Sequence, residues 1–388
     1  MPFRHLQNKP QKLPTFTTEA SSYRQSPSIK SLPHRSLHSM AQRHGPLILL
    51  HLGLAPTLLV SSADCAKEIF KTHDIIFANR PDSSIPRRLL YDYKDVSLAP
   101  YGEYWRQMRS ICVLQLLSLK RVQSFRFIRQ EEINLMIEKI NQSYSSSSTI
   151  DLSEVFPSLT NDIVCRVAFG RRYAECEDRI VDDHMKRQSE GVDISEDQKD
   201  IVDVLLQIQK ESVTNSISLS RESIKAVVLD MFAAGTDTIH ISLEWTMTEL
   251  IRHPQVMKEA QDEIRRIVGS KPDITEDDLE NQLKMSRFKG RDPKSWKEPE
   301  EFRPERFLNS SIDFKGHDFR FIPFGEGRRG CPGATFALVI IELVLASLLR
   351  KFDWALPGET RAEDMDVTES WGLSVHRKLP LVVVATPY

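Results

Sequence analysis

A single cysteine near the C-terminus lies in a setting that could hold a metal ion. Glycine adopts positive φ without steric cost, so a glycine-rich loop can turn tightly and present one sulfur. Pro332, directly after Cys331, suits the first turn of a helix, whose free N–H groups and dipole favour a thiolate. We interpret Cys331 as a candidate axial metal ligand; the alternative is a buried structural cysteine. The constrained positions of this loop are Phe324, Gly325, Gly327, Arg329, Cys331 and Gly333.

A second unusual stretch interrupts a long apolar segment. Ala233-Ala-Gly-Thr-Asp-Thr238 lies inside a helix predicted over 224–250, although Gly and Thr have poor helix propensity. Such a local conflict often marks a functional site. The carboxyl of Asp237 beside the hydroxyl of Thr238 is what a proton relay requires. The alternative is a helix kink in which the threonine hydroxyls bond back to their own helix carbonyls.

These two motifs together resemble those of the cytochrome P450 superfamily, most closely its plant A-type microsomal enzymes. Pro304-Glu-Arg-Phe307 is a third matching motif, and the resemblance extends over about 31–388. It implies a mainly α-helical fold with small β-sheets. It also implies haem b as the cofactor, with Cys331 as the proximal thiolate that favours O–O cleavage.

The resemblance also implies which residues contact the haem. Within the cysteine loop, Arg329 would pair with a propionate and Phe324 would pack beside the sulfur, in the turn that Gly325 and Gly333 help to form. In the helix that follows Tyr101, a Trp-x-x-x-Arg motif places two hydrogen-bond donors on the same face of the helix. These donors, Trp105 and Arg109, would bind a propionate; the alternative is a half-buried tryptophan beside an exposed arginine.

For the central helix, the resemblance implies residues that handle oxygen and protons. Gly235 would open a groove for O2, and Asp237 with Thr238 would deliver protons during its activation. Ile239 stands where relatives usually carry a second hydroxyl, which weakens this relay.

The remaining elements follow the order expected of the same fold. Apolar periodicity and turn residues predict the segments that would position the site. The predicted elements are a helix over 31–45, a hairpin of strands 46–52 and 57–61, helices over 62–73, 101–109, 130–140, 158–169, 255–268 and 334–349, a surface loop over 143–148, and a closing β-hairpin over 371–385.

Two pieces of the expected fold are missing from the sequence. Between Tyr173 and Ile180 the chain omits much of the lid that roofs the substrate pocket, and between 282 and 290 it omits the Glu-x-x-Arg helix and several strands. Arg306 therefore loses its expected buried partners, at a typical cost of about 3–5 kcal/mol, unless it is exposed to solvent. Glu326 places a carboxylate near the thiolate, where like charges disfavour each other.

Composition excludes several other classes of protein. The formal net charge of −2 gives no electrostatic case for nucleic-acid binding, and five scattered cysteines without a Cys-x-x-Cys pair argue against disulfides and zinc. Residues 1–30 are rich in polar residues and are predicted to be disordered, followed by one truncated domain over 31–388. No run reaches the roughly 18 apolar residues of a membrane span. We expect a soluble or weakly peripheral protein, although the relatives are anchored on the cytosolic face of the endoplasmic reticulum.

Three functional hypotheses follow. The first is a monomeric haem-thiolate monooxygenase that takes NADPH-derived electrons from a cytochrome P450 reductase and inserts one atom of O2 into a small lipophilic metabolite. The second is a truncated, catalytically silent relative that binds haem poorly or not at all. The third is a non-haem thiol enzyme built on Cys331, for which no local motif supplies a histidine base. The sequence does not identify a substrate, because pocket shape decides specificity.

Overall fold

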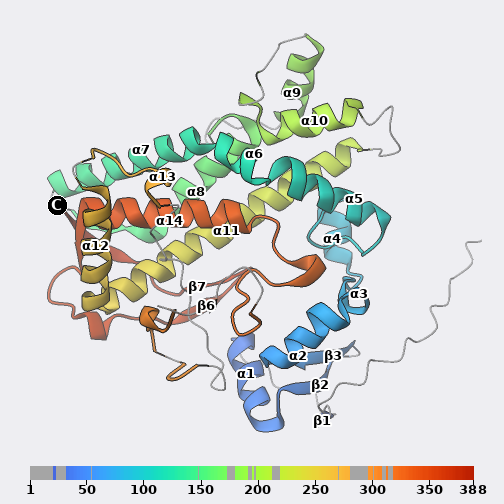
Figure 1. Ribbon diagram of the computed structural model, residues 1–388, viewed down its shortest axis with the longest axis horizontal. Coiled ribbons are helices and arrows are strands. Elements are labelled where there is room, and N and C mark those ends of the chain that lie inside the picture. The colour runs from blue at the N-terminus through green and yellow to red at the C-terminus, as the bar shows by residue number, and fades with distance from the viewer. Residues whose placement is uncertain are drawn as a thin grey trace, which may run out of the picture. The chain divides into compact units, whose positions relative to one another are not determined.

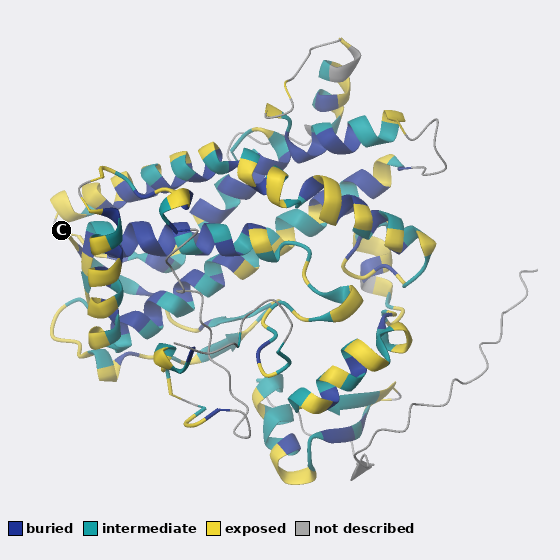
Figure 2. Cartoon of the chain, viewed as in Figure 1, coloured by how far each residue is buried: buried dark blue, intermediate teal, exposed yellow. Residues whose placement is uncertain are grey.

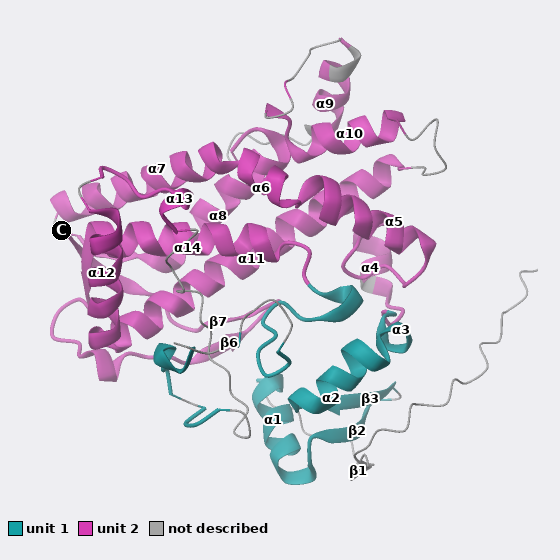
Figure 3. Ribbon diagram, in the orientation of Figure 1, with its two compact units in different colours: residues 1–79, 289–330 teal, residues 80–288, 331–388 magenta. Residues whose placement is uncertain are grey.

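The computed structural model describes residues 21–22, 32–53, 55–146, 148–172, 180–190, 195, 198–211, 219–269, 271–279, 296–299, 301–307, 312 and 318–388. The chain divides into two compact units, one of 1–79 with 289–330 and one of 80–288 with 331–388 (Figure 3). The described elements are mainly helices with small sheets, as predicted (Figure 1). The single domain predicted over 31–388 stays a prediction.

The first unit combines a small sheet with short helices. Strands β2 and β3 form the predicted antiparallel hairpin, in which Leu47 pairs with Val60, and Ser21–Ser22 (β1) pairs parallel to β2. The predicted helix α1 ends at Gly45, whose φ of 100° suits glycine. The elements are α1 Pro33–His44, β2 Leu47–Leu52, β3 Ala55–Val60, α2 Ala63–Lys67, the π-helix η1 Glu68–Thr72, α3 Asp74–Phe77, and the 3-10 turns η5 Pro304–Phe307 and η6 Gly327–Arg329.

The second unit is a helical body with two small sheets. Its helices are α4 Ser84–Leu89, α5 Glu103–Ile111, the π-helix η2 Cys112–Leu116, α6 Leu119–Ser124, α7 Arg126–Ser145, α8 Leu152–Phe169, α9 Ile180–Ser189, α10 Ile201–Glu211, α11 Arg221–Arg252, α12 Pro254–Val268, α13 Glu276–Leu279 and α14 Ala334–Lys351. Its strands are β4 Ile150–Asp151, β5 Phe352–Ala355, β6 Glu369–Trp371, β7 Val375–Arg377 and β8 Val382–Pro387.

The core of the second unit forms where α8, α11 and α14 pack together. Side chains from each helix, such as Ile163, Leu243 and Val344, are fully buried there (Figure 2). Within the described residues, α11 is the one helix long and apolar enough by composition to cross a membrane. Because it packs against α8, α12 and α14, it has the contacts of a core helix.

Two buried ion pairs join segments that are distant in sequence. Glu276 of α13 accepts hydrogen bonds from Arg129 of α7, with Nε–Oε1 at 2.6 Å and Nη2–Oε2 at 2.9 Å. Glu244 of α11 lies 3.9 Å from Arg377 of β7, and both side chains are buried. These pairs satisfy charges that would otherwise be costly to bury.

The structure corrects three predictions and places others outside its described residues. Helix α7 continues to Ser145, so residues 143–145 of the loop predicted over 143–148 are helical, and the Ser143 and Ser145 hydroxyls donate to carbonyl oxygens one turn earlier. Strand β8 pairs with β4 and β5 instead of with β7, so the closing hairpin is β6–β7 alone. Ser21–Ser22 form a strand within the segment predicted to be disordered; the rest of 1–30 and both predicted deletions lie outside the described residues.

Candidate functional site

Cys331 lies just before helix α14, as the sequence predicts, but the helix begins at Ala334, so Pro332 lies outside its first turn. Gly333 is the N-cap residue of this helix, and its backbone N–H donates a hydrogen bond to the Cys331 sulfur. Cys331 is exposed, whereas Cys65, Cys112 and Cys165 are buried. The thiol of Cys331 is therefore accessible to a ligand, and the alternative of a buried structural cysteine is wrong.

The protonation state of this thiol differs from the sequence-based expectation. Partial burial of the sulfur raises the pKa of Cys331, and this effect outweighs the Gly333 N–H and the positive charge of Arg109, which both lower it. The helix N-terminus thus does not by itself make Cys331 a thiolate. Formation of the anion at neutral pH requires a further positive charge at the sulfur.

The loop before the cysteine belongs to the first unit and is fastened to α3. Gly325 and Gly327 both adopt a φ of 69°, which explains their residue type. Asp74 of α3 pairs with the Arg328 side chain, Nε–Oδ2 2.7 Å, and accepts its backbone N–H. Arg329 donates from Nε to the carbonyl oxygen of Ala78 at 2.7 Å. That bond uses one of five guanidinium N–H groups, so it does not preclude a propionate.

Helix α5 positions the predicted Trp105 and Arg109. Trp105 is 3% exposed, and its indole N–H donates to the carbonyl oxygen of Val96 at 2.9 Å. The indole has one N–H only, so donation to a propionate would require this bond to open. Arg109 is half-buried in the same unit as Cys331, and its charge acts on that sulfur. The haem-binding role of both residues stays a prediction.

Thr238 lies on an exposed part of the central helix α11. Ala233, Ala234 and Thr238 are exposed, although the helix is otherwise part of the core. The Thr238 hydroxyl donates to the carbonyl oxygen of Ala234 at 2.6 Å. In the same way, the hydroxyls of Ser242 and Thr246 each donate to the carbonyl oxygen four residues earlier in the helix. The back-bonding proposed as the alternative is thus present, but α11 runs unbroken through this stretch.

Two polar atoms of the same stretch are buried without partners. Among the described residues, the Asp237 Oδ2 and Thr236 Oγ1 atoms have no hydrogen-bond partner. Polar groups without a protein partner usually bind a water or an ion, or have a functional role. Gly235 faces α8, where an added Cβ would lie 3.1 Å from Val164 Cγ2. Its missing side chain therefore permits close helix packing, and its role in O2 access stays a prediction.

Sequence reasoning missed Asp230, which lies one turn before Ala234. Its carboxyl accepts the backbone N–H groups of Val96 and Ser97, at 2.7 and 3.2 Å. The signal was visible: an acidic residue between Leu229 and Met231, within a run that is otherwise apolar.

Arg306 matches the expectation of a residue without its full set of partners. Its Nη2 donates to the carbonyl oxygens of Glu298 and Glu301, at 3.1 and 3.0 Å, and its guanidinium lies over the Trp296 ring. The Nη1 atom is buried and has no partner among the described residues.

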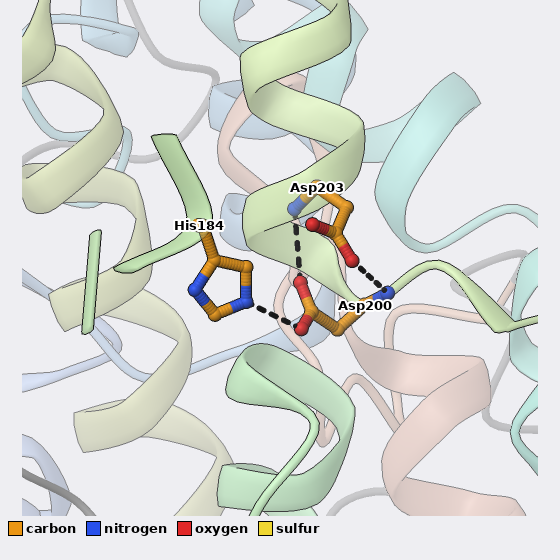
Figure 4. Close-up of side chains that lie close together, drawn as sticks. All are labelled: His184, Asp200 and Asp203. Atoms are coloured by element: carbon orange, nitrogen blue, oxygen red, sulfur yellow. Dashed lines mark hydrogen bonds and ion pairs between the residues drawn. The ribbon is translucent and has the colours of Figure 1, made fainter. Parts of the chain in front are cut away.

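A separate cluster of possible metal ligands lies at the start of α10. His184, Asp200 and Asp203 offer ligand atoms within 4.8 Å of one another (Figure 4). His184 Nε2 lies 2.7 Å from Asp200 Oδ2, and the two aspartates accept each other's backbone N–H groups. Arg187 approaches both carboxyls, at 4.0 and 3.8 Å. Because these atoms already have protein partners and a guanidinium faces them, we interpret the cluster as a fastening of α9 to α10.

A cavity of about 230 Å³ lies between α7 and α8 and is lined by none of the predicted site residues. Glu132 at its wall pairs with Arg166 and Arg172, so its charge is compensated. We assign no chemistry to this cavity.

The residues of the second unit fit a haem-thiolate site. The thiol of Cys331 and a strip of small residues on α11 are exposed, and the buried Asp237 Oδ2 atom has no hydrogen-bond partner among the described residues. The positive charge of Arg109 near the sulfur suits an anionic cofactor.

Comparison with known proteins identifies the same family. The family model described as "Cytochrome P450" matches residues 14–186, 175–285 and 288–384. Its pieces join near 175–186 and 285–288, where the sequence predicts missing segments. "Cytochrome P450 736A117" of Prunus mume is 45% identical over 458 residues, covering 93% of this chain and 88% of that protein. This alignment is longer than the chain itself, so the relative has segments without a counterpart here.

A second relative and a solved structure agree. "Norfluorocurarine oxidase" of Strychnos sp is 39% identical, and the match covers 92% of this chain and 89% of that protein. A zebra fish cytochrome P450 structure with progesterone superposes with a TM-score of 0.76 at 22% identity, covering 92% of this chain and 99% of that one. The latter shows a shared fold.

Proposed function

The chain belongs to the cytochrome P450 family, whose members are haem-thiolate monooxygenases, and on this premise we propose that it inserts one atom of O2 into a small lipophilic plant secondary metabolite. The observation that carries the proposal is the exposed Cys331 directly before α14. The Strychnos relative, named as an oxidase of norfluorocurarine, supports a secondary metabolite as the substrate class.

In this proposal the cysteine loop and α5 hold the cofactor. Cys331 would ligate the iron of haem b, while Arg109 and Arg329 would pair with its propionates. Trp105 would join them once its bond to Val96 opens. Phe324, Gly325 and Gly333 would form the wall of the sulfur pocket. When bound, the haem supplies the one-electron and O2 chemistry that the side chains lack.

The α11 residues would then move protons. The Thr238 hydroxyl donates a hydrogen bond to the carbonyl oxygen of Ala234, which leaves its oxygen lone pairs to accept a hydrogen bond from a neighbour. Asp237 has a buried oxygen that no described residue satisfies, so it can accept a proton there. A carboxyl next to a hydroxyl can pass protons in sequence, and Gly235 keeps the helix surface low beside them.

The proposed partners follow from this reaction. Electrons would come from NADPH through a cytochrome P450 reductase, so we place the protein at the cytosolic face of the endoplasmic reticulum membrane. We propose peripheral attachment and a monomeric state.

A silent, truncated relative is the second candidate. Two observations favour it: the Arg306 Nη1 atom is buried without a partner among the described residues, and the Prunus mume alignment exceeds the length of this chain. Because a charge network that lacks partners destabilises the fold around it, such a chain would take up haem weakly.

The test is haem reconstitution of the full chain, followed by the carbon monoxide difference spectrum of the reduced protein. We expect a Soret band of the thiolate type in the wild type and in Cys65→Ser, a control at a buried cysteine. Cys331→Ser should lose the thiolate-type band. Substrate-dependent NADPH consumption with added reductase then tests turnover.

A second readout separates the two candidates. A ligand that binds only the folded state raises its stability, by about 2.7 kcal/mol at a hundredfold excess over Kd. We therefore expect haem to raise the thermal unfolding midpoint of the wild type. A midpoint unaffected by haem, with no Soret band, would establish the silent relative instead.

A further inference from the structure

The segment 94–98 is held by side chains of α5 and α11 rather than by a regular element. Asp230 of α11 accepts the N–H groups of Val96 and Ser97, and Trp105 of α5 donates to the carbonyl oxygen of Val96. Within the segment, Asp95 Oδ2 accepts the N–H of Leu98 at 2.6 Å. The backbone of this segment therefore depends on two carboxyl groups, Asp95 and Asp230.

Both carboxyls also contact one hydroxyl. Ser97 Oγ lies 2.8 Å from Asp95 Oδ2 and 2.7 Å from Asp230 Oδ1. A serine hydroxyl carries one proton and can donate one hydrogen bond. If both carboxyls were ionised, one of these two oxygen–oxygen contacts would have no proton in it and would be repulsive.

The two carboxyls accept backbone N–H groups, but no cationic side chain among the described residues compensates two negative charges. Asp95 is fully buried, and its Oδ1 atom has no partner among the described residues. Within the described part of the chain, neither carboxyl forms an ion pair with a cationic side chain. Two like charges that share a site cannot both ionise readily.

We propose that Asp95 and Asp230 hold one proton between them through Ser97, and that this shared proton latches the segment 94–98 onto α11. The two carboxyls are positioning residues: through Val96 they fix the indole of Trp105. When the proton leaves to solvent, one contact becomes repulsive and the segment loosens. This device does not depend on haem, so it stands or falls separately from the proposed monooxygenase activity.

Two other titratable groups, Tyr104 and Cys112, lie near the pair. Tyr104 of α5 interacts with both carboxyls, and Cys112 of η2 interacts with Asp230. Burial raises the pKa values of Tyr104 and Cys112, the latter to about 12, so both stay neutral near pH 7. Arg80 donates to the carbonyl oxygen of Ser97 and not to a carboxyl.

The raised pKa of Asp230 sets the direction of the pH dependence. Burial, with a smaller contribution from Asp95, raises the pKa of Asp230 above its usual value of 3.8. A carboxyl whose pKa is raised in the folded protein stabilises the folded state while it is protonated. The latch is therefore complete at low pH and weakens as the pH rises and Asp230 loses its proton.

The test is hydrogen exchange of the Val96, Ser97 and Leu98 amides in the full chain, expressed as protection relative to an unstructured peptide, between pH 4 and 9. We expect wild-type protection to fall about tenfold as the pH rises, the change that one hydrogen bond is worth. An asparagine side chain keeps the shape of a protonated aspartic acid and can donate to Ser97. In Asp230→Asn the amide nitrogen can replace Oδ1 and donate to Ser97, while the amide oxygen still accepts the N–H groups of Val96 and Ser97. Asp230→Asn should therefore keep the protection and remove its pH step, while Asp230→Ala loses protection at every pH.

Asp278→Asn is the matched control. Asp278 accepts the N–H and hydroxyl of Thr275, and Lys271 lies beside it, so its pKa is lowered and it acts as an anion. Its amide variant should lower the protection of the Thr275 amide. If Asp230→Asn loses protection as this control does, or if wild-type protection shows no pH step, the shared proton is overturned.

Discussion

At the scale of single residues, the site depends on the balance of forces on one sulfur. Cys331 is exposed and accepts the Gly333 N–H, yet partial burial keeps its pKa above the ordinary value. Arg109 is the side chain whose positive charge opposes this effect. The thiol therefore becomes more reactive as the pH rises and the thiolate forms.

Replacing Arg109 should make this thiol still less acidic. In Arg109→Gln, loss of the positive charge removes an interaction that favours the thiolate, so alkylation of Cys331 at pH 9 should be slower than in the wild type. Mass spectrometry of the peptide that contains Cys331 measures the rate in the haem-free chain.

Arg106→Gln is the control for this change, because Arg106 is exposed on the same helix and contacts the Tyr101 ring. It should leave the alkylation rate unchanged. Equal rates in wild type and Arg109→Gln would show that the guanidinium does not act on the sulfur.

The sequence predicted the residue types of the site but not how their hydrogen bonds are used. The two motifs located Cys331 and Thr238, because few sequences carry these residue types at these spacings. It did not reveal that the Trp105 N–H goes to Val96 or that the Thr238 hydroxyl bonds to Ala234. Such bonds depend on which backbone atoms lie nearby, and that is decided by packing, not by the motif.

At the scale of elements, the cysteine loop owes its path to a close approach between two segments of the first unit. An added Cβ at Gly327 would lie 2.8 Å from Asp74 Oδ1 and 3.0 Å from the carbonyl oxygen of Phe70. Asp74 is itself held by Arg328. The loop can therefore reach η1 and α3 only with glycine at this position.

Two glycine variants separate backbone strain from steric contact. Gly325 and Gly327 share a φ of 69°, so an alanine at either costs about 1–2 kcal/mol of left-handed strain. At Gly325 the nearest atom to an added Cβ is 3.9 Å away. Gly327→Ala should therefore cost about 1–3 kcal/mol more than Gly325→Ala, measured by urea unfolding. Equal losses would mean that the contact with Asp74 relaxes without cost.

Long periodic elements were predicted better than the pairing of strands. Helices α11 and α14 follow from apolar periodicity over many residues, and Gly45 and Gly53 mark the ends of α1 and β2. The partner of β8 was predicted wrongly, because strand order depends on contacts with β4 and β5 that are remote in sequence. The same limit applies to the His184–Asp200 contact, which no spacing rule indicates.

At the scale of the whole molecule, buried ion pairs join segments that are far apart in the sequence. The Glu276–Arg129 pair links α13 to α7 across more than a hundred residues, and both side chains are buried. Arg126 and Asp277 form a parallel pair at the surface, where Asp277 is 67% exposed. Arg126 also lies 3.4 Å from Glu276, so the two pairs belong to one network that contains a buried and an exposed carboxylate.

Neutralising the buried pair should destabilise the protein far more than neutralising the exposed one. Glu276→Gln leaves Arg129 buried without a counter-charge and should lower the free energy of unfolding by about 3–5 kcal/mol. Asp277→Asn should lower it by about 0–1 kcal/mol, because water screens that pair. Urea unfolding of both variants measures the difference, and similar losses would contradict the role given to burial.

The hydrogen bonds that side chains make within helix α11 affect how readily the protein can gain or lose neighbouring segments during evolution. The hydroxyls of Thr238, Ser242 and Thr246 are satisfied within the helix itself, so they place no demand on whatever segment lies next to them. Neighbouring segments can then be gained or lost along a lineage without leaving these groups stranded. Thr236 and Asp237 are the exceptions on this stretch, and selection on the helix should be strictest there.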